Sequence, residues 1–176
     1  MAEYDYPDEP AGPFDAPPIE FEDREGREIE IRVYDEEWFD ALCAMYDTFD
    51  PADRAQGIPP AREERVRSWL DVILDEGQDV IAVDNDTDRV VGHATLVPDG
   101  NEGTELAIFV HQDYQGAGVG ARLIRALLGH GKEQGVTKVW LTVERWNHPA
   151  VNLYETVGFE SSSVESFELE MTLRLD

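Results

Sequence analysis

Residues 105–120 read ELAIFVHQDYQGAGVG, and this stretch decides the fold that the chain is expected to adopt. Apolar residues occupy both faces of positions 106–110, which is the pattern of a buried β-strand. A short polar loop follows, and glycine then stands at three of the five positions 116–120. Beyond the glycines, apolar residues recur at helical spacing as far as Leu128. The stretch therefore predicts a strand, a glycine-rich turn and a helix in direct succession.

The glycine-rich turn has the properties of a phosphate-binding loop. The start of a helix carries N–H groups without backbone partners and a partial positive charge, and glycine lets a ligand reach them. The whole chain holds 14 basic and 39 acidic residues, whereas the window 115–150 holds five basic and two acidic ones: Arg122, Arg125, Lys132, Lys138, Arg145, Glu133 and Glu144. Such a positive region in an acidic protein favours a polyanionic ligand. The alternative is a tight turn without a ligand, and Arg122 and Arg125 are either phosphate contacts or solvated surface residues.

A dinucleotide-binding fingerprint, Gly-x-Gly-x-x-Ala, also fits positions 116–121, with Glu144 as the acid that would bind the ribose. That fingerprint places its first glycine directly at the end of the strand, but residues 111–115 intervene here. A doubly wound domain also requires several further strand–helix units, and too little chain follows Glu144 to supply them. The spacing therefore argues against an NAD(P)-dependent oxidoreductase.

The order Gln-x-x-Gly-x-Gly at positions 115–120, after a strand that begins with Glu105, resembles the GCN5-related N-acetyltransferase (GNAT) family. The resemblance continues into residues 147–155, NHPAVNLYE, and then Gly158-Phe159. These look like the family segment in which an asparagine precedes a short helix that carries a tyrosine. In element order the similarity covers residues 29–175. Each motif is short, and their order and spacing together carry the resemblance.

The resemblance implies that the acetyl group of acetyl-coenzyme A moves directly to an amine, without a covalent enzyme intermediate. The amine would belong to a small molecule, a protein lysine or a protein N-terminus. Three features match the family's cofactor site: the pyrophosphate loop, the late central strand that offers an oxyanion-binding N–H and an edge for pantetheine, and the asparagine before the short helix. Their residues are Gln115, Gly116, Ala117, Gly118, Val119, Gly120, Phe109, Val110 and Asn147. N-capping of the helix that starts near Pro149 is a second role for Asn147, compatible with the first.

Two side chains are the candidates for proton transfer. An alkylamine has a pKa of about 10.4, so a base must remove its proton at neutral pH. Glu105 is the first candidate, because the family often has a glutamate at the start of this strand. The alternatives are Glu144, His111 and His93. Tyr154 matches the family's general acid, which protonates the departing thiolate. The purely structural interpretations are that Glu105 is a solvated residue at a strand end and that Tyr154 is a core tyrosine.

The acceptor pocket is expected beside the loop Thr48–Pro60, between the first two helices, where Asp50 and Asp53 would suit a cationic amine. A sensor that binds acyl-coenzyme A without turnover is the non-enzymatic alternative, and Glu105 and Tyr154 count against it. A net charge of −25 argues against nucleic acid as a partner. The four histidines show no metal-ligand spacing, so no metal is expected.

Composition also indicates where the protein works. No apolar run reaches membrane-spanning length and the acidic start does not resemble an export signal, so a cytoplasmic protein without a membrane partner is expected. The single cysteine, Cys43, fits a reducing compartment. Only two of the 14 basic residues are lysines, and together with the 39 acidic residues this indicates adaptation to high salt. The oligomeric state stays open, a homodimer included.

The pattern divides the chain into an acidic, proline-rich extension over residues 1–26 and a GNAT domain over residues 27–176. The extension is expected to have no core of its own, and its aromatic residues leave open whether it docks on the domain. The domain's elements are expected in the order strand, two helices, three strands, helix, strand, helix, two strands. This predicts an α/β (α+β) fold, with a mixed, mostly antiparallel central sheet of about seven strands flanked by helices on both faces.

Overall fold

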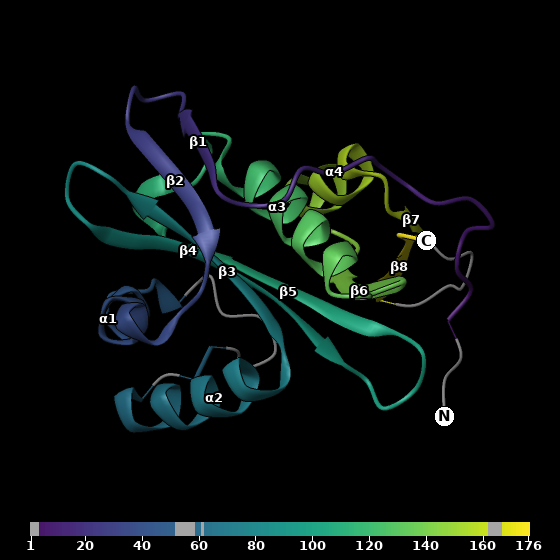
Figure 1. Cartoon of the computed structure of the whole chain (residues 1–176), viewed down its shortest axis with the longest axis horizontal. Coiled ribbons are helices and arrows are strands. Elements are labelled where there is room, and N and C mark those ends of the chain that lie inside the picture. Colours follow the sequence, from purple (N-terminus) through teal and green to yellow (C-terminus); the bar gives the residue numbers. More distant parts are fainter. Residues whose placement is uncertain (1–3, 52–58, 61, 162–166) are drawn as a thin grey trace.

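The structure, a computed structural model, describes residues 4–51, 59–60, 62–161 and 167–176. This part of the chain forms a single sheet with helices on both faces (Figure 1). The strands are β1 (Ile19–Glu22), β2 (Glu28–Val33), β3 (Gln78–Asp84), β4 (Arg89–Pro98), β5 (Thr104–Val110), β6 (Lys138–Glu144), β7 (Glu160–Ser161) and β8 (Glu168–Arg174). The α-helices are α1 (Phe39–Asp47), α2 (Glu63–Glu76), α3 (Val119–Glu133) and α4 (His148–Val157), and the short 3-10 helices are η1 (Glu36–Trp38) and η3 (Gln112–Tyr114).

The sheet has the order β1-β2-β3-β4-β5-β6-β8-β7 and confirms the predicted mixed α/β architecture. The expected number of about seven strands was too low, because the described residues form eight. The additional strand is β1, which lies within the acidic extension and pairs antiparallel with β2, with Ile19 opposite Ile31. Its short apolar pattern is interrupted by acids, but Phe21 is buried in the core. The pairing with β2 therefore outweighs the weak local signal.

Helices cover both faces of the sheet (Figure 1), and a cluster of buried hydrophobic residues lies beneath them on each face. On one face, α3 and α4 pack against alternate residues of β5, namely Leu106, Ile108 and Val110. On the other face, α1 and α2 pack against Ala107 and Phe109 of the same strand. The strand is therefore apolar on both sides, as its sequence predicted.

The pairing between β5 and β6 is parallel and is confined to two positions, Thr104 opposite Val139 and Glu105 opposite Trp140. In contrast, β4 pairs with β5 over the whole length of β5, from Thr104 to Val110. Beyond Glu105, the edge of β5 that faces β6 pairs with no other strand in the described part of the chain. The sheet consequently opens between β5 and β6.

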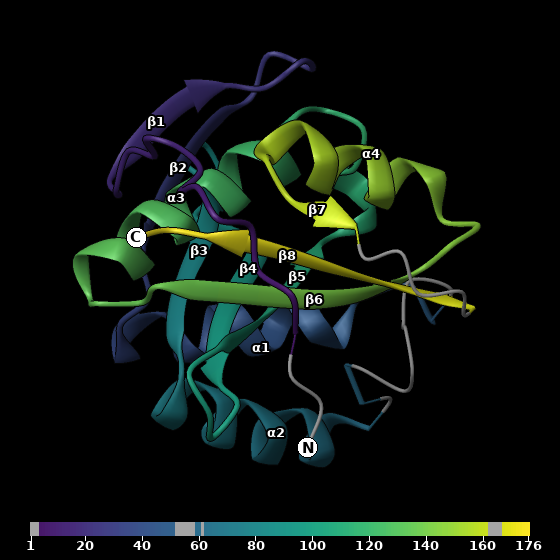
Figure 2. The same cartoon turned by 90° about the vertical axis from the view of Figure 1, so that its right-hand side faces the viewer.

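The start of the described chain, residues 4–18, lies across the sheet and is called the N-terminal segment below. In Figure 2 this segment is the purple trace that crosses β6 and β8. Thr172 Oγ1 donates a hydrogen bond to the carbonyl of Asp5 at 2.7 Å, and Arg174 Nε donates to the carbonyl of Pro7 at 2.7 Å. Phe14 then packs against the core on the α3 face. The segment therefore docks on the domain, which the sequence had left open.

Asp35 caps the first helical turn, because its Oδ1 accepts a hydrogen bond from the N–H of Glu37 at 2.9 Å. The capped element is the 3-10 turn η1, which leads directly into α1. The final hairpin is present, although β7 ends at Ser161 and residues 162–166 lie outside the described part.

Candidate active site

The glycine-rich loop ends at the N-terminus of α3 and has the conformation that glycine permits. Gly116 has φ of 73° and Gly118 has φ of 91°, so both lie in the left-handed region that other residues rarely adopt. Gly118 is the N-cap of α3, and no described side chain caps this helix start. The first turn of α3 also contains no acidic residue. The backbone N–H groups of this turn are therefore available to an anionic ligand.

Hydrogen bonds hold the loop in place. Gln115 Nε2 donates to the carbonyl of Val110 at 2.9 Å, which fixes the loop to the end of β5. The N–H of Arg24 donates to the carbonyl of Ala117 at 3.0 Å, so the turn after β1 supports the loop from the other side. Arg27 Nη1 donates to the carbonyl of Asp113 at 2.9 Å and strengthens the same contact. The loop is thus held by two segments that are far apart in the sequence.

Arg24 is a candidate phosphate contact that the sequence reasoning missed. Its Nε lies 3.8 Å from the position that a Cβ would take on Gly118, and the Arg24 residue is exposed. The structure also divides the positive window that the sequence predicted. Arg122 and Arg125 lie on the first turns of α3, whereas Lys138 lies at the start of β6 and forms a 2.8 Å ion pair with Glu102. The acidic surroundings of Arg24 in the sequence gave no signal of its position at the loop.

Phe109 and Val110, the predicted oxyanion and pantetheine residues, lie on β5 beyond the point where its pairing with β6 ends. Phe109 is buried against α1 and α2, while Val110 packs on the α3 face. Their backbone therefore borders the opening between β5 and β6 from the β5 side. An extended ligand with amide groups can pair with a strand edge of this kind.

Glu105 lies where the two strands separate, next to Trp140 on β6. It alternates with Ala107 and Phe109, so it points to the face of the sheet that α1 and α2 cover further along β5. Although the residue is exposed, partial burial of its carboxyl group raises the pKa, and the negative charge of Asp99 raises it further. A raised pKa makes the carboxylate a stronger base.

The two histidines that were alternative bases are buried and engaged. His93 Nδ1 and Tyr46 Oη are hydrogen-bonded at 2.7 Å, and His93 Nε2 and Asp79 Oδ1 at 2.7 Å. His111 Nε2 is hydrogen-bonded to Thr48 Oγ1 at 2.9 Å, and its Nδ1 accepts from the N–H of Asp113 at 3.2 Å. Both ring nitrogens of each histidine are therefore occupied within the fold.

The other candidate carboxylate, Glu144, is half-buried at the end of β6, opposite Glu168 of β8. Its carbonyl accepts a hydrogen bond from the N–H of Asn147 at 2.9 Å. Of the two loop residues expected at the acceptor pocket, Asp50 is exposed and its N–H donates to Gln112 Oε1 at 3.0 Å, whereas Asp53 lies outside the described residues.

Tyr154 lies on α4, on the face of the sheet opposite to Glu105. Its ring packs against Phe159 with the ring centroids 5.9 Å apart, and burial raises the pKa of its phenol to about 12. The neighbouring Leu153 lies 3.5 Å from the position that a Cβ would take on Gly120, so α4 packs closely on the first turn of α3. Tyr154 therefore lies on the helix that packs on the first turn of α3, and its phenol is protonated at neutral pH.

Asn147 is the N-cap of α4, and its Oδ1 accepts a hydrogen bond from the N–H of Ala150 at 3.4 Å. The structural role predicted for this residue is therefore present. The Asn147 residue is also exposed, so its amide group remains accessible from the end of β6.

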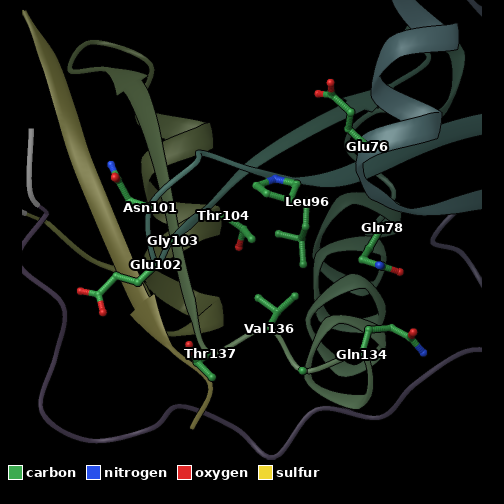
Figure 3. A pocket seen from close by; sticks show the side chains of 12 residues that line it. Glu76, Gln78, Leu96, Asn101, Glu102, Gly103, Thr104, Gln134, Val136 and Thr137 are labelled. Atoms are coloured by element: carbon green, nitrogen blue, oxygen red, sulfur yellow. The ribbon is translucent and has the colours of Figure 1, made fainter. Parts of the chain in front are cut away.

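A different pocket, of about 260 Å³, lies at the other end of β5, near the C-terminus of α3 (Figure 3). Leu96 and Val136 point toward each other across it, and Glu76, Gln78 and Gln134 contribute polar groups to its lining (Figure 3). No arginine or lysine is among the residues that line it. Its position and charge do not suit a phosphate, so the site of interest is the opening beside the glycine loop.

Within the described ranges, no group of three or more histidine, cysteine, aspartate or glutamate side chains is arranged to hold a metal ion. Across those same ranges, every helix is too short or too polar to cross a membrane.

Comparison with known proteins identifies the family. The sequence model of the Acetyltransferase (GNAT) family matches residues 31–159, which is most of the chain. This chain belongs to the GNAT family. The matched range contains β5 and β6, which border the opening, together with the glycine loop, α3 and α4.

Several proteins named as acetyltransferases are similar to this chain. A mycothiol acetyltransferase of Thermobifida fusca is 29% identical over 148 residues, which cover 76% of this chain and 44% of the relative. A ribosomal protein bS18-alanine N-acetyltransferase of Escherichia coli is 36% identical over 64 residues, which cover 36% of this chain and 43% of the relative. The chain thus spans less than half the length of these two curated relatives. Among solved structures, yncA from Salmonella typhimurium with its cofactor acetyl-CoA is similar to this chain, with a TM-score of 0.66 and 20% sequence identity. The match covers 84% of this chain and 94% of that chain, so the two share the GNAT fold.

Proposed function

We propose that this GNAT protein transfers the acetyl group of acetyl-coenzyme A to an amine, with Glu105 as the base and Tyr154 as the acid. The observation that carries the proposal is the opening between β5 and β6, which begins at Glu105 and ends beside the glycine loop. Glu105 stands at the corner of this opening, and Tyr154 lies on α4, which packs on the opposite face of the sheet. An amine and a thioester that meet between the strands would therefore have one proton-transfer group on each side.

Three features support acetyl-coenzyme A as the donor. The N-terminus of α3 offers uncapped N–H groups for the pyrophosphate, and Arg24 lies beside Gly118 with its charge exposed. The free edge of β5 suits the two amide groups of the pantetheine arm. Asn147 stands exposed at the start of α4, where it is accessible to the cofactor.

The chemistry follows from the placement of the two side chains. Glu105 accepts a proton from the ammonium form of the acceptor, directly or through water, and its raised pKa suits this role. The free amine then forms a bond to the carbonyl carbon, and a backbone N–H near Phe109 or Val110 stabilises the negative charge on the carbonyl oxygen. The carbonyl re-forms as the carbon–sulfur bond breaks, and Tyr154 donates its phenolic proton to the sulfur. The nitrogen then releases its second proton, which returns to Tyr154 through water and restores the phenol, while Glu105 passes the first proton to solvent. The products are the N-acetylated amine and free coenzyme A.

The acceptor remains a choice between a small amine and an amine on a protein. The names of the two relatives point to both kinds of acceptor. The Escherichia coli relative is named for alanine of a ribosomal protein, and the Thermobifida fusca relative is named for mycothiol. The exposed carboxylate of Glu105 at the opening supports an acceptor that arrives with a positive charge.

The test is a screen of amines with acetyl-coenzyme A, read as the release of free thiol. We expect release with at least one amine and stabilisation of the protein by acetyl-coenzyme A in a melting experiment. Stabilisation by NAD alone would instead favour an oxidoreductase. Binding of acetyl-coenzyme A without thiol release from any amine would favour a non-catalytic sensor.

A further inference from the structure

The N-terminal segment reaches the side of the opening where Glu105 lies. The ring of Tyr4 stacks on the indole of Trp140, with the ring centroids 4.3 Å apart and the planes inclined by 15°. Trp140 is the residue of β6 that stands directly beside Glu105. Tyr4 therefore contacts the immediate neighbour of the proposed base, on the face that the acceptor would approach.

The domain contains features that fit this segment. A Cβ on Gly103 would collide with the hydroxyl of Tyr6 and would lie 2.9 Å from Asp99 Oδ2, so the missing side chain at this position leaves room for Tyr6 where the segment packs. Trp140 Nε1 donates a hydrogen bond to the same Asp99 oxygen at 2.9 Å, which fixes the indole under the Tyr4 ring. The hydrogen bond from Thr172 to the carbonyl of Asp5, described above, holds the next residue of the segment. Tyr4 is thus positioned by the stacking of its ring on Trp140 and by the hydrogen bond to its neighbour Asp5.

The surroundings of Tyr4 are negatively charged. Burial raises the pKa of its phenol, and the charges of Glu170, Glu105 and Asp99 raise it further, in that order. The nearby cation Lys138 faces the ring of Tyr6 at 5.5 Å and is paired with Glu102, so it is directed toward a different ring. Aromatic faces among carboxylates attract an alkylammonium ion, since the ring quadrupole and the negative charges act in the same direction.

We propose that Tyr4 is a specificity-determining residue of the acceptor site, where the Tyr4–Trp140 pair selects an acceptor that arrives as an alkylammonium ion. The carbon chain of the acceptor lies against the aromatic pair, and its ammonium group is brought to the carboxylate of Glu105. This assignment rests on the proposed acetyl transfer and adds the N-terminal segment to the acceptor pocket expected between α1 and α2. A free alkylamine and a lysine side chain share the required chemistry.

The first experiment measures ligand selection without turnover. Choline is an alkylammonium ion without a transferable N–H, and its uncharged analogue carries a tert-butyl group in place of the trimethylammonium group. We titrate both into the full chain saturated with coenzyme A, at one salt concentration, and follow binding by NMR. We expect choline to bind about tenfold more tightly than the analogue, the effect of a cation–π contact of roughly 1.4 kcal/mol. Equal binding of the two probes would overturn the proposal.

Variants of Tyr4 test the residue itself. Tyr4→Ala is expected to remove most of the preference for choline, and Tyr4→Phe to retain it, because the ring and not the hydroxyl attracts the cation. Tyr4→Leu keeps an apolar contact with Trp140 but lacks the aromatic ring. It replaces Tyr4→Ala in the same measurement if the alanine variant does not fold. Asp8→Ala is the matched control, since Asp8 is exposed in the same segment. An unchanged preference in Tyr4→Ala or Tyr4→Leu would refute the role of Tyr4.

Kinetics separate this inference from the proposed function. With an amine found in the thiol-release screen, Tyr4→Ala should raise the KM for the amine about tenfold and leave the KM for acetyl-coenzyme A unchanged. Comparing a free alkyl diamine with a short peptide that contains lysine distinguishes the two sources of the ammonium group. Turnover with an unchanged KM for the amine would refute the role of Tyr4 while acetyl transfer stands. Choline selectivity without any thiol release would instead refute acetyl transfer.

Discussion

Glu105 and Trp140 are the last residues that β5 and β6 pair, and the two strands separate immediately beyond them. The proposed base is therefore fixed at the corner of the opening, with the indole of Trp140 held beside it by Asp99. This corner joins three parts of the chain: the central strand, the strand that follows α3, and the N-terminal segment through Tyr4. Catalysis and acceptor selection are thus expected to depend on the same few side chains.

Replacing Glu105 by glutamine tests the base. The amide keeps the shape of the side chain but cannot accept the amine proton, so kcat/KM should fall about a hundredfold or more. In the parent protein, activity should fall as the pH drops through the raised pKa of Glu105, because the protonated carboxyl cannot act as a base. A pH–rate profile is the measurement, and that acid limb should disappear in Glu105→Gln. Glu64→Gln, an exposed glutamate on α2, is the control, and an acid limb that persists in Glu105→Gln would assign the base elsewhere.

Removing only the hydroxyl of Tyr154 tests the acid. A pKa of about 12 keeps this phenol protonated throughout the neutral range, so it carries the proton that the thiolate needs. Because the contact matters in the transition state, Tyr154→Phe should lower turnover by about a hundredfold and leave the affinity for acetyl-coenzyme A nearly unchanged. Turnover, cofactor affinity and melting temperature are measured together. Normal turnover in a stable Tyr154→Phe protein would leave Tyr154 with a packing role alone.

Arg24 provides a test of the donor site. If its guanidinium contacts a phosphate of acetyl-coenzyme A beside Gly118, Arg24→Gln should weaken cofactor binding by about fivefold, as expected for an exposed charge pair. The loss should shrink as salt is added, since exposed charges are screened. Calorimetric titration at two salt concentrations gives both values. Arg65→Gln, an exposed arginine on α2, should bind the cofactor normally, and equal affinities for both variants would place Arg24 outside the phosphate site.

The buried hydrogen-bond network of Asp79, His93 and Tyr46 should contribute to the stability of the fold. Tyr46→Phe deletes the hydroxyl that is hydrogen-bonded to His93 at 2.7 Å and leaves a buried ring nitrogen without that partner. The free energy of unfolding should fall by about 1–3 kcal/mol. Denaturant unfolding measures the difference, with Tyr34→Phe, a half-buried tyrosine on the same side of the sheet, as the matched comparison. A loss no larger than that of Tyr34→Phe would show that the hydrogen bond adds nothing.

Salt dependence tests the interpretation of the acidic composition. With 39 acidic and 14 basic residues, repulsion between like charges should destabilise the folded chain at low salt. The melting temperature should therefore rise between low and molar potassium chloride as the charges are screened. We propose on this basis that the protein works in a cytoplasm of high salt. A melting temperature that stays constant or falls over this range would contradict the proposal.

The sequence by itself determined the features that depend on neighbouring residues. The apolar alternation of 106–110 predicted β5, and the glycine pattern predicted the loop, in which the structure then showed Gly116 and Gly118 in the left-handed region. Asn147, expected as an N-cap, also marked a real helix start. Each of these signals reflects backbone geometry over a few residues, so it can be read without knowing the rest of the fold.

Only the tertiary structure decided which distant residues meet at the site. The sequence did not show that β1 joins the sheet, that Arg24 stands beside Gly118, or that Tyr4 stacks on Trp140. It also did not show that Glu105 lies where β5 and β6 separate, or that Tyr154 lies on the opposite face of the sheet. These contacts depend on strand order and on the point where β5 and β6 cease to pair. Such long-range pairings are selected by burial and loop closure across the whole chain, and a local sequence pattern does not record them.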